Sequence, residues 1–184
     1  MTLITKNITN NDPSIVYYTY ALMTKLNGNL RYYNLLENNF EANEIFKGLW
    51  LGSLESSYDQ ETLKQKGITH IISVLAGYEP PYPDDFNYLV IHALDNQTSN
   101  LSEVFNETSD FIADALANDG SVLVHCAYGR SRSATIVAAY LIDAFGMDFE
   151  SLMKAMRMKR NIVDPNPYYV TQLKEYYKSK YEEF

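Results

Sequence analysis

A single cysteine lies in the stretch of this sequence whose residue types are best suited to chemistry. Gly129, Arg132 and Ser133 follow Cys126 closely. A deprotonated cysteine is a strong nucleophile, and an arginine guanidinium can bind two oxygens of a phosphoryl group at once. A lone cysteine is most often a small buried apolar residue. Here the glycine and arginine that follow favour attack of a Cys126 thiolate on phosphorus instead.

The residues between Cys126 and the next expected helix have the size and composition of an anion-binding loop. Backbone N–H groups of such a loop can surround one tetrahedral anion, and Gly129 allows the positive φ or close approach that this requires. A helix beginning at Arg132 would point its positive end at the same place. These donors would also lower the pKa of the thiol. The predicted phosphate-binding residues are Ala127, Tyr128, Gly129, Arg130, Ser131 and Arg132.

Three further side chains are candidates for roles around Cys126. The Ser133 hydroxyl could donate to the sulfur and help it leave when a cysteinyl-phosphate is hydrolysed. His125 could orient the loop from behind, in a structural rather than an acid–base role. Asp95 follows an expected strand and could protonate the leaving oxygen, although these residues alone leave the role of a turn aspartate equally open. Carboxylates in a proline-rich loop are weaker candidates for the acid, namely Glu79, Asp84 and Asp85.

Alternating strands and helices are expected to position these residues. Short apolar runs predict strands at 49–51, 69–75, 88–93 and 121–125, and helical periodicity or capping residues predict helices at 59–66, 100–118, 132–145, 148–158 and 166–181. This order predicts an α/β fold with a central, mostly parallel sheet flanked by helices. The phosphate-binding loop would then connect a buried strand to a helix, at the strand end where ligands of such sheets bind.

The first 43 residues have a different pattern from the rest. Apolar residues at three- and four-residue steps predict an amphipathic helix at 14–26, and a shorter helix is expected at 30–37. The predicted organisation is an N-terminal helical extension, residues 1–43, followed by a catalytic domain, residues 44–184. If the extension only covers the domain, its deletion should lower the melting temperature and change activity only through stability.

Composition narrows the class of protein. The 184 residues carry 15 basic and 23 acidic side chains, a net charge of −8, which argues against a nucleic-acid or anionic-membrane binder. The one cysteine excludes an internal disulfide and a thiolate metal cluster within the chain, and it favours a reducing compartment, the cytoplasm or the nucleus. No apolar run reaches the length of a membrane span, and no metal or cofactor is expected.

The string at 125–133, His-Cys-Ala-Tyr-Gly-Arg-Ser-Arg-Ser, resembles the H-C-x-x-G-x-S-R-S signature of the dual-specificity phosphatases. The resemblance spans about 44–181 and is carried further by the segments 45–53, 67–74, 88–95, 156–160 and 165–173. It implies that Cys126 is the nucleophile, Arg132 the phosphate-binding arginine, Ser133 the leaving-group hydroxyl and Asp95 the general acid. His125 and Asn166 are assigned supporting roles. The implied substrates are proteins phosphorylated on tyrosine, serine or threonine, and the family uses no metal.

Two other functions stay open at this point. The same chemistry could act on a phosphoinositide or an RNA 5′ end, since residues 125–160 hold six basic and three acidic side chains and Arg130 adds charge inside the loop. Against this, lipid phosphatases commonly have two lysines in the loop, and Ser131 stands where such relatives tend to have glycine or asparagine. A phosphate-binding module without turnover ranks last, because the cysteine, the arginine and the acid are all present.

Departures from the family pattern bear on specificity and partners. Tyr128 occupies a position that is often a small residue, and its ring is expected to narrow or line the mouth of the pocket. Pro167, Tyr168 and Tyr169 stand where glycine and phenylalanine are common. The first 43 residues lack the basic cluster and spaced aliphatic residues of a docking site for a mitogen-activated protein kinase.

Overall fold

The structure, a computed structural model, describes residues 1–7 and 40–182. Its centre is one six-stranded sheet with the order β1-β5-β4-β6-β3-β2. All neighbouring strands are parallel except β2 and β3, so the expectation of a mostly parallel sheet is confirmed. The strands are β1 (Leu3–Asn7), β2 (Ala42–Phe46), β3 (Leu49–Gly52), β4 (Ile68–Val74), β5 (Asn87–His92) and β6 (Ser121–His125).

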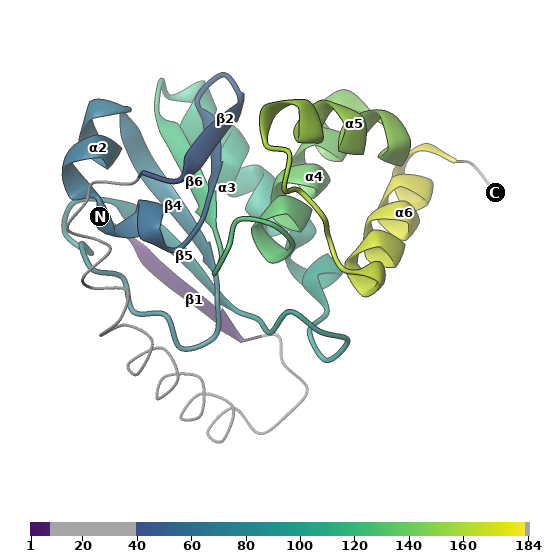
Figure 1. The fold of residues 1–184 in the computed structure, drawn as a ribbon, viewed down its shortest axis with the longest axis horizontal. Coiled ribbons are helices and arrows are strands. Elements are labelled where there is room, and N and C mark those ends of the chain that lie inside the picture. Colours follow the sequence, from purple (N-terminus) through teal and green to yellow (C-terminus); the bar gives the residue numbers. More distant parts are fainter. Residues whose placement is uncertain (8–39, 183–184) are drawn as a thin grey trace.

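Helices cover both faces of the sheet, more heavily on one face. In Figure 1, α4, α5 and α6 lie together on one side of the sheet. Two short 3₁₀ helices, η1 (Glu55–Tyr58) and η2 (Leu101–Val104), complete the fold. The α-helices are α2 (Gln60–Gln65), α3 (Phe105–Ala117), α4 (Arg132–Phe145), α5 (Phe149–Lys159) and α6 (Pro167–Tyr181). None of the helices in the described ranges has the length and apolar character needed to cross a membrane.

Two clusters of apolar side chains, one on each face of the sheet, pack the sheet against the helices. Successive residues of a strand point to opposite faces, and on β4 the neighbours Ile71 and Ile72 enter different clusters. The larger cluster joins the sheet to α3, α4, α5 and α6, whereas the smaller one lies under α2 and contains Leu63 and Tyr88. Because both faces are covered, the central strands are apolar on both sides. This rigid sheet fixes the strand ends at which the candidate site lies.

Most of the expected elements are present, with shifts of one or two residues at their ends. The helix expected at 100–118 is divided into η2 and α3. Two strands at the edges of the sheet, β1 and β2, were not predicted. Strand β2 pairs antiparallel with β3. Strand β1 pairs in parallel with β5, with Leu3 opposite Tyr88, and so brings the first residues into the same sheet. The helices expected at 14–26 and 30–37 lie outside the described residues. The domain boundary at residue 44 stays a prediction.

Candidate active site

The candidate site lies at the carboxyl end of β6, a central strand of the parallel sheet. Strand β6 ends at His125, and α4 begins at Arg132. Cys126, the first residue after the strand, is 2% exposed. The apolar strand before the loop and the apolar helix after it are both buried in the core, and this anchoring sets the path of the six residues between them.

The backbone of this loop is turned so that its carbonyl groups point outward. The carbonyl oxygens of residues 127–131 each accept a hydrogen bond from a group outside this stretch. The donors are Leu54 N to Ala127 O (3.4 Å), Arg160 Nη2 to Tyr128 O (3.0 Å), Arg160 Nε to Gly129 O (2.9 Å), Asp164 N to Arg130 O (2.9 Å) and Thr135 N to Ser131 O (2.8 Å). In a trans peptide the next N–H points opposite to the carbonyl, so the N–H groups of residues 128–132 face inward. They form a cradle for a tetrahedral anion.

Gly129 lets the loop lie close to β3. Its φ is 63°, in the left-handed region, and a Cβ built on it would lie 2.5 Å from the carbonyl oxygen of Gly52. A real Cβ would have to displace the backbone there. The positive φ and the close approach expected from the sequence are both present at this residue.

Gly129→Ala should therefore impair both stability and phosphate binding. The left-handed conformation costs a non-glycine residue about 1–2 kcal/mol, and the contact with Gly52 adds to this and shifts the loop. Gly146→Ala is a matched control, because Gly146 has φ 60° but its Cβ would meet only ordinary contacts with the Tyr181 ring, at 3.6 Å. Both variants should lower the melting temperature in thermal unfolding, whereas only Gly129→Ala should weaken inhibition by vanadate. Equal inhibition constants would contradict this account.

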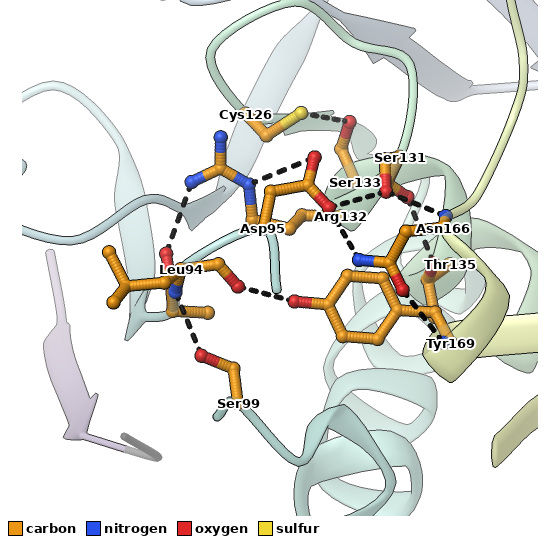
Figure 2. Close-up of polar contacts among 11 residues, drawn as sticks. Leu94, Asp95, Ser99, Cys126, Ser131, Arg132, Ser133, Thr135, Asn166 and Tyr169 are labelled. Carbon is orange, nitrogen blue, oxygen red and sulfur yellow. Dashed lines mark hydrogen bonds and ion pairs between the residues drawn. The ribbon is translucent and has the colours of Figure 1, made fainter. Parts of the chain in front are cut away.

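Arg132 and Ser133 are placed around the sulfur by the first turn of α4. The Arg132 guanidinium is buried, and its Nη1 donates to the Ala93 carbonyl oxygen at 3.1 Å. Ser133 Oγ donates to Cys126 Sγ at 3.1 Å. Figure 2 shows the thiol and the Ser133 hydroxyl joined in this way, with the guanidinium close to the Asp95 carboxylate. A buried cation and a hydroxyl donor thus lie near the only thiol of the chain.

The environment of Cys126 favours the thiolate. Burial opposes ionisation, but the charge of Arg132, the Ser133 hydroxyl and the backbone N–H groups of Ser133 and Tyr128 outweigh it, so the pKa of the thiol lies below its ordinary value. A lowered pKa raises the fraction of the nucleophilic form near neutral pH.

Asp95 lies in the loop after β5 and reaches the same place. Its Oδ1 accepts hydrogen bonds from Ser131 Oγ and Asn166 Nδ2, both at 2.7 Å, and its Oδ2 lies 3.8 Å from Arg132 Nε. Asn166 itself is held as the N-cap of α6, since its Oδ1 accepts from Tyr169 N at 3.1 Å. The carboxylate is therefore oriented by two other segments of the chain, residues 131–132 and Asn166. With a 36% exposed side chain it remains accessible to a substrate.

His125 is fully buried behind the loop. Its Nε2 lies 2.7 Å from Ser73 Oγ, and its ring stacks edge-on against Tyr78 at 4.9 Å between centroids. Burial, with a smaller contribution from the Arg132 charge, lowers the pKa of His125 to about 3. The imidazole is neutral at physiological pH, which favours a structural role.

Two side chains of the predicted phosphate-binding set lie at the surface of the protein. The Arg130 guanidinium forms an ion pair with Asp164, which also lies 3.8 Å from Arg157. The Tyr128 side chain is on the surface, with 65% of the residue exposed. Both residues offer the cradle their backbone, and their side chains lie on the rim.

Arg160 is a neighbour of the loop that the residue-level reasoning missed. It holds two loop carbonyls, those of Tyr128 and Gly129, from the C-terminal end of α5. Arg160 lies in the segment 156–160, which resembles the family. Nothing in that segment indicates contact with a loop about thirty residues earlier. Tyr169 was likewise singled out only as a departure, yet its hydroxyl donates to the Leu94 carbonyl oxygen at 2.5 Å, beside Asp95.

Comparison with known proteins identifies the class. Residues 49–179 match the family model described as "Dual specificity phosphatase, catalytic domain", so the chain belongs to this family of protein phosphatases. Dual specificity protein phosphatase 1B of Arabidopsis thaliana is 42% identical over 145 residues, which cover 79% of this chain and 87% of the relative. Dual specificity protein phosphatase 22-A of Danio rerio is 37% identical over 77% of this chain and 68% of its own length.

Solved structures agree with this assignment. The crystal structure of DUSP15 superposes with a TM-score of 0.74 at 32% identity and covers 78% of this chain and 92% of that chain. The human tyrosine phosphatase-like serine/threonine/tyrosine-interacting protein gives 0.73 at 35% identity, over 79% and 100%. With its family, fold and relatives together, the chain is a dual-specificity protein phosphatase.

Proposed function

We propose that this protein hydrolyses phosphotyrosine, phosphoserine and phosphothreonine in proteins through a cysteinyl-phosphate on Cys126. The observation that carries the proposal is the position of the Cys126 thiol at the base of a cradle of inward-facing N–H groups, with its pKa lowered by Arg132 and Ser133. Phosphate would occupy the cradle with its phosphorus facing the sulfur.

In the first step the Cys126 thiolate attacks phosphorus in line with the leaving oxygen. The S–P bond forms as the P–O bond to the substrate breaks, and Arg132 and the loop N–H groups stabilise the charge on the equatorial oxygens. Asp95 in its protonated form donates its proton to the leaving oxygen. The hydrogen bonds from Ser131 and Asn166 orient that carboxyl group.

In the second step a water molecule attacks the cysteinyl-phosphate. Asp95, now a carboxylate, accepts the proton from this water while the P–S bond breaks. The departing thiolate is stabilised by Arg132 and by the hydroxyl of Ser133, which already donates to the sulfur. Inorganic phosphate leaves, and the enzyme returns to its starting state. Side chains of the chain supply the nucleophile and the acid, and the Arg132 guanidinium and the backbone N–H groups of the loop supply the anion stabilisation.

The geometry favours protein substrates over the lipid or RNA alternative. The charge of Arg130, the main argument for an anionic non-protein substrate, is paired with Asp164. The exposed Tyr128 ring offers an apolar surface beside the cradle for the residue that carries the phosphate. We also propose a cytoplasmic or nuclear location, because a reactive thiolate needs a reducing environment. We propose that the protein binds no nucleic acid and has no kinase-docking motif.

Turnover of a small aryl phosphate by the purified chain tests the activity, and a panel of substrates tests the class. We expect phosphotyrosine and phosphothreonine peptides to be hydrolysed at higher kcat/KM than phosphoinositides or RNA 5′ phosphates. Faster turnover of a non-protein ester would favour the alternative. Tight binding of phosphopeptides without turnover between pH 5 and 8 would instead indicate a binding module.

A further inference from the structure

Arg160 connects the phosphate-binding loop to the beginning of β2. Its Nε donates to Gly129 O at 2.9 Å and its Nη2 to Tyr128 O at 3.0 Å. On the other side, Nη1 donates to Asn43 Oδ1 at 2.9 Å and Nη2 to Glu41 Oε1 at 3.1 Å. One guanidinium thus joins two segments of the chain that are far apart in sequence.

The planar fork of Arg160 has little freedom to move. An arginine has five N–H donors in fixed directions, and these four hydrogen bonds use most of them. The side chain is only 4% exposed. Any displacement of Asn43 or Glu41 must therefore be accompanied by a displacement of the guanidinium or by the loss of a hydrogen bond in a buried place.

Backbone packing joins the same segments independently of the arginine. A Cβ on Gly52 would lie 2.8 Å from the Cβ of Ala42 and 3.1 Å from the carbonyl oxygen of Glu41. On its other side, Gly52 is the residue against which Gly129 is packed. The loop, the end of β3 and residues 41–43 therefore form three close layers, and Arg160 ties the first to the third.

We propose that Arg160 is a positioning residue of the phosphate-binding loop, and that Asn43 and Glu41 set its orientation. This inference rests on the proposed catalytic use of the loop. By holding the carbonyls of Tyr128 and Gly129 outward, Arg160 turns the N–H groups of Gly129 and Arg130 toward the phosphate, because each N–H shares a rigid peptide with the preceding carbonyl. The start of β2 thereby helps to orient the backbone N–H groups that bind the phosphate.

The first test compares Arg160→Met and Arg160→Lys with Lys159→Met. Lys159 directly precedes Arg160, carries the same charge and is exposed, so its loss controls for charge alone. Arg160→Met should lower kcat/KM by about 10²-fold, the cost of misplacing a catalytic group by about 1 Å. Arg160→Lys should be nearly as impaired, because a single ammonium cannot replace the fork.

Readouts beyond activity separate positioning from mere structural support. In Arg160→Met, vanadate and inorganic phosphate should bind more weakly, and the pH midpoint of Cys126 alkylation by iodoacetamide should rise. A purely structural residue would lower the melting temperature and leave the alkylation midpoint of the folded protein unchanged. Kinetic constants and alkylation midpoints like those of Lys159→Met would overturn the inference.

Asn43 offers a second test at an exposed residue, in case the buried arginine cannot be replaced without unfolding. Asn43→Ala should lower kcat/KM by about tenfold, because the arginine loses one charge-assisted hydrogen bond, whereas Lys47→Ala, an exposed change in the same hairpin, should not. In an Arg160→Met background, Asn43→Ala should have no further effect. Additive losses of kcat/KM would overturn the proposal that Asn43 acts through Arg160.

The outcomes also distinguish this inference from the proposed function. If the wild-type chain shows no Cys126-dependent turnover, the proposed function fails, while weaker phosphate binding by Arg160→Met would still support the positioning role. If the wild type is active and both Arg160 variants bind phosphate normally, only the positioning role fails. Deletion of residues 1–43 would remove Glu41 and Asn43, and it should therefore reduce activity beyond the effect of lost stability.

Discussion

Cys126→Ser should eliminate turnover, lowering kcat by roughly 10⁴- to 10⁶-fold, the range seen when an enzyme loses its nucleophile. The substitution is nearly isosteric, so the loop and Arg132 keep their positions. The surroundings of Cys126 lower the pKa of its thiol and so favour the thiolate, but a serine hydroxyl is a far weaker acid and remains protonated. The variant should therefore still bind a phosphopeptide and fail at the step that forms the covalent intermediate.

Single-turnover experiments with a radiolabelled phosphopeptide provide the measurement. After an acid quench, label should stay on the wild-type chain and be absent from Cys126→Ser. Ser133→Ala distinguishes the two roles of the Cys126 sulfur, as nucleophile in the first step and as leaving group in the second. This variant keeps Cys126 but removes the hydroxyl that donates to the sulfur. We expect label to accumulate in Ser133→Ala, because departure of the thiolate becomes slower than attack. Turnover by Cys126→Ser near the wild-type rate would exclude the cysteinyl-phosphate.

The pH dependence of alkylation tests the same site without substrate. A thiol with a lowered pKa is a thiolate over a wider range of pH, so iodoacetamide should inactivate the wild type with a midpoint below that of a free cysteine. Arg132→Met should move the midpoint upward, because the charge of Arg132 favours the thiolate. A wild-type midpoint at or above the free value would contradict this description of the site.

Asp95→Asn should lower kcat by about 10²- to 10⁴-fold for substrates with a poor leaving group, the range for loss of a general acid. The asparagine can still accept through its Oδ1 the hydrogen bonds that Ser131 and Asn166 give to Asp95. The loss should therefore be chemical rather than structural. Binding of the phosphopeptide should be retained.

The choice of leaving group makes this prediction specific. A phosphoserine peptide leaves as an alkoxide and needs the proton, whereas an activated aryl phosphate leaves as a stable phenolate and needs it much less. Asp95→Asn should thus be severely impaired on the peptide and only mildly on the activated ester. Asp84→Asn is the control, because Asp84 belongs to the proline-rich loop considered as the weaker source of the acid. Equal losses of kcat on both substrates would show that another carboxylate is the general acid.

The sequence predicted the candidate site better than it predicted the site's supports. The strand, loop and helix around Cys126 are contiguous, so local patterns and the motif determine them together. Asp95 was ambiguous from the residues alone because its partners Ser131 and Asn166 lie 36 and 71 residues away. Arg160 reaches the loop from 31 residues away, and a single arginine has no periodic pattern to reveal such a contact.

Strand β1, at one edge of the sheet, was missed for a related reason. Strand β1 has five residues and pairs only with β5, and Leu3 is 52% exposed. A short, half-covered edge strand has neither the buried apolar run nor the strict alternation that predicts strands. Its place depends on a partner 85 residues later, opposite Tyr88, which local sequence cannot indicate.

The outward carbonyls of the loop also bear on how substrate preference can change. Apart from the Arg132 guanidinium, the proposed anion donors are backbone groups, so phosphate recognition does not depend on the side chains at Ala127, Tyr128 or Arg130. The rings and charges at Tyr128 and Arg130 are on the rim and can be replaced without removing a donor. Backbone atoms of this short segment thus bind the phosphate, while its side chains contact the rest of the substrate. Substitutions at these positions can change substrate preference and leave phosphate binding intact.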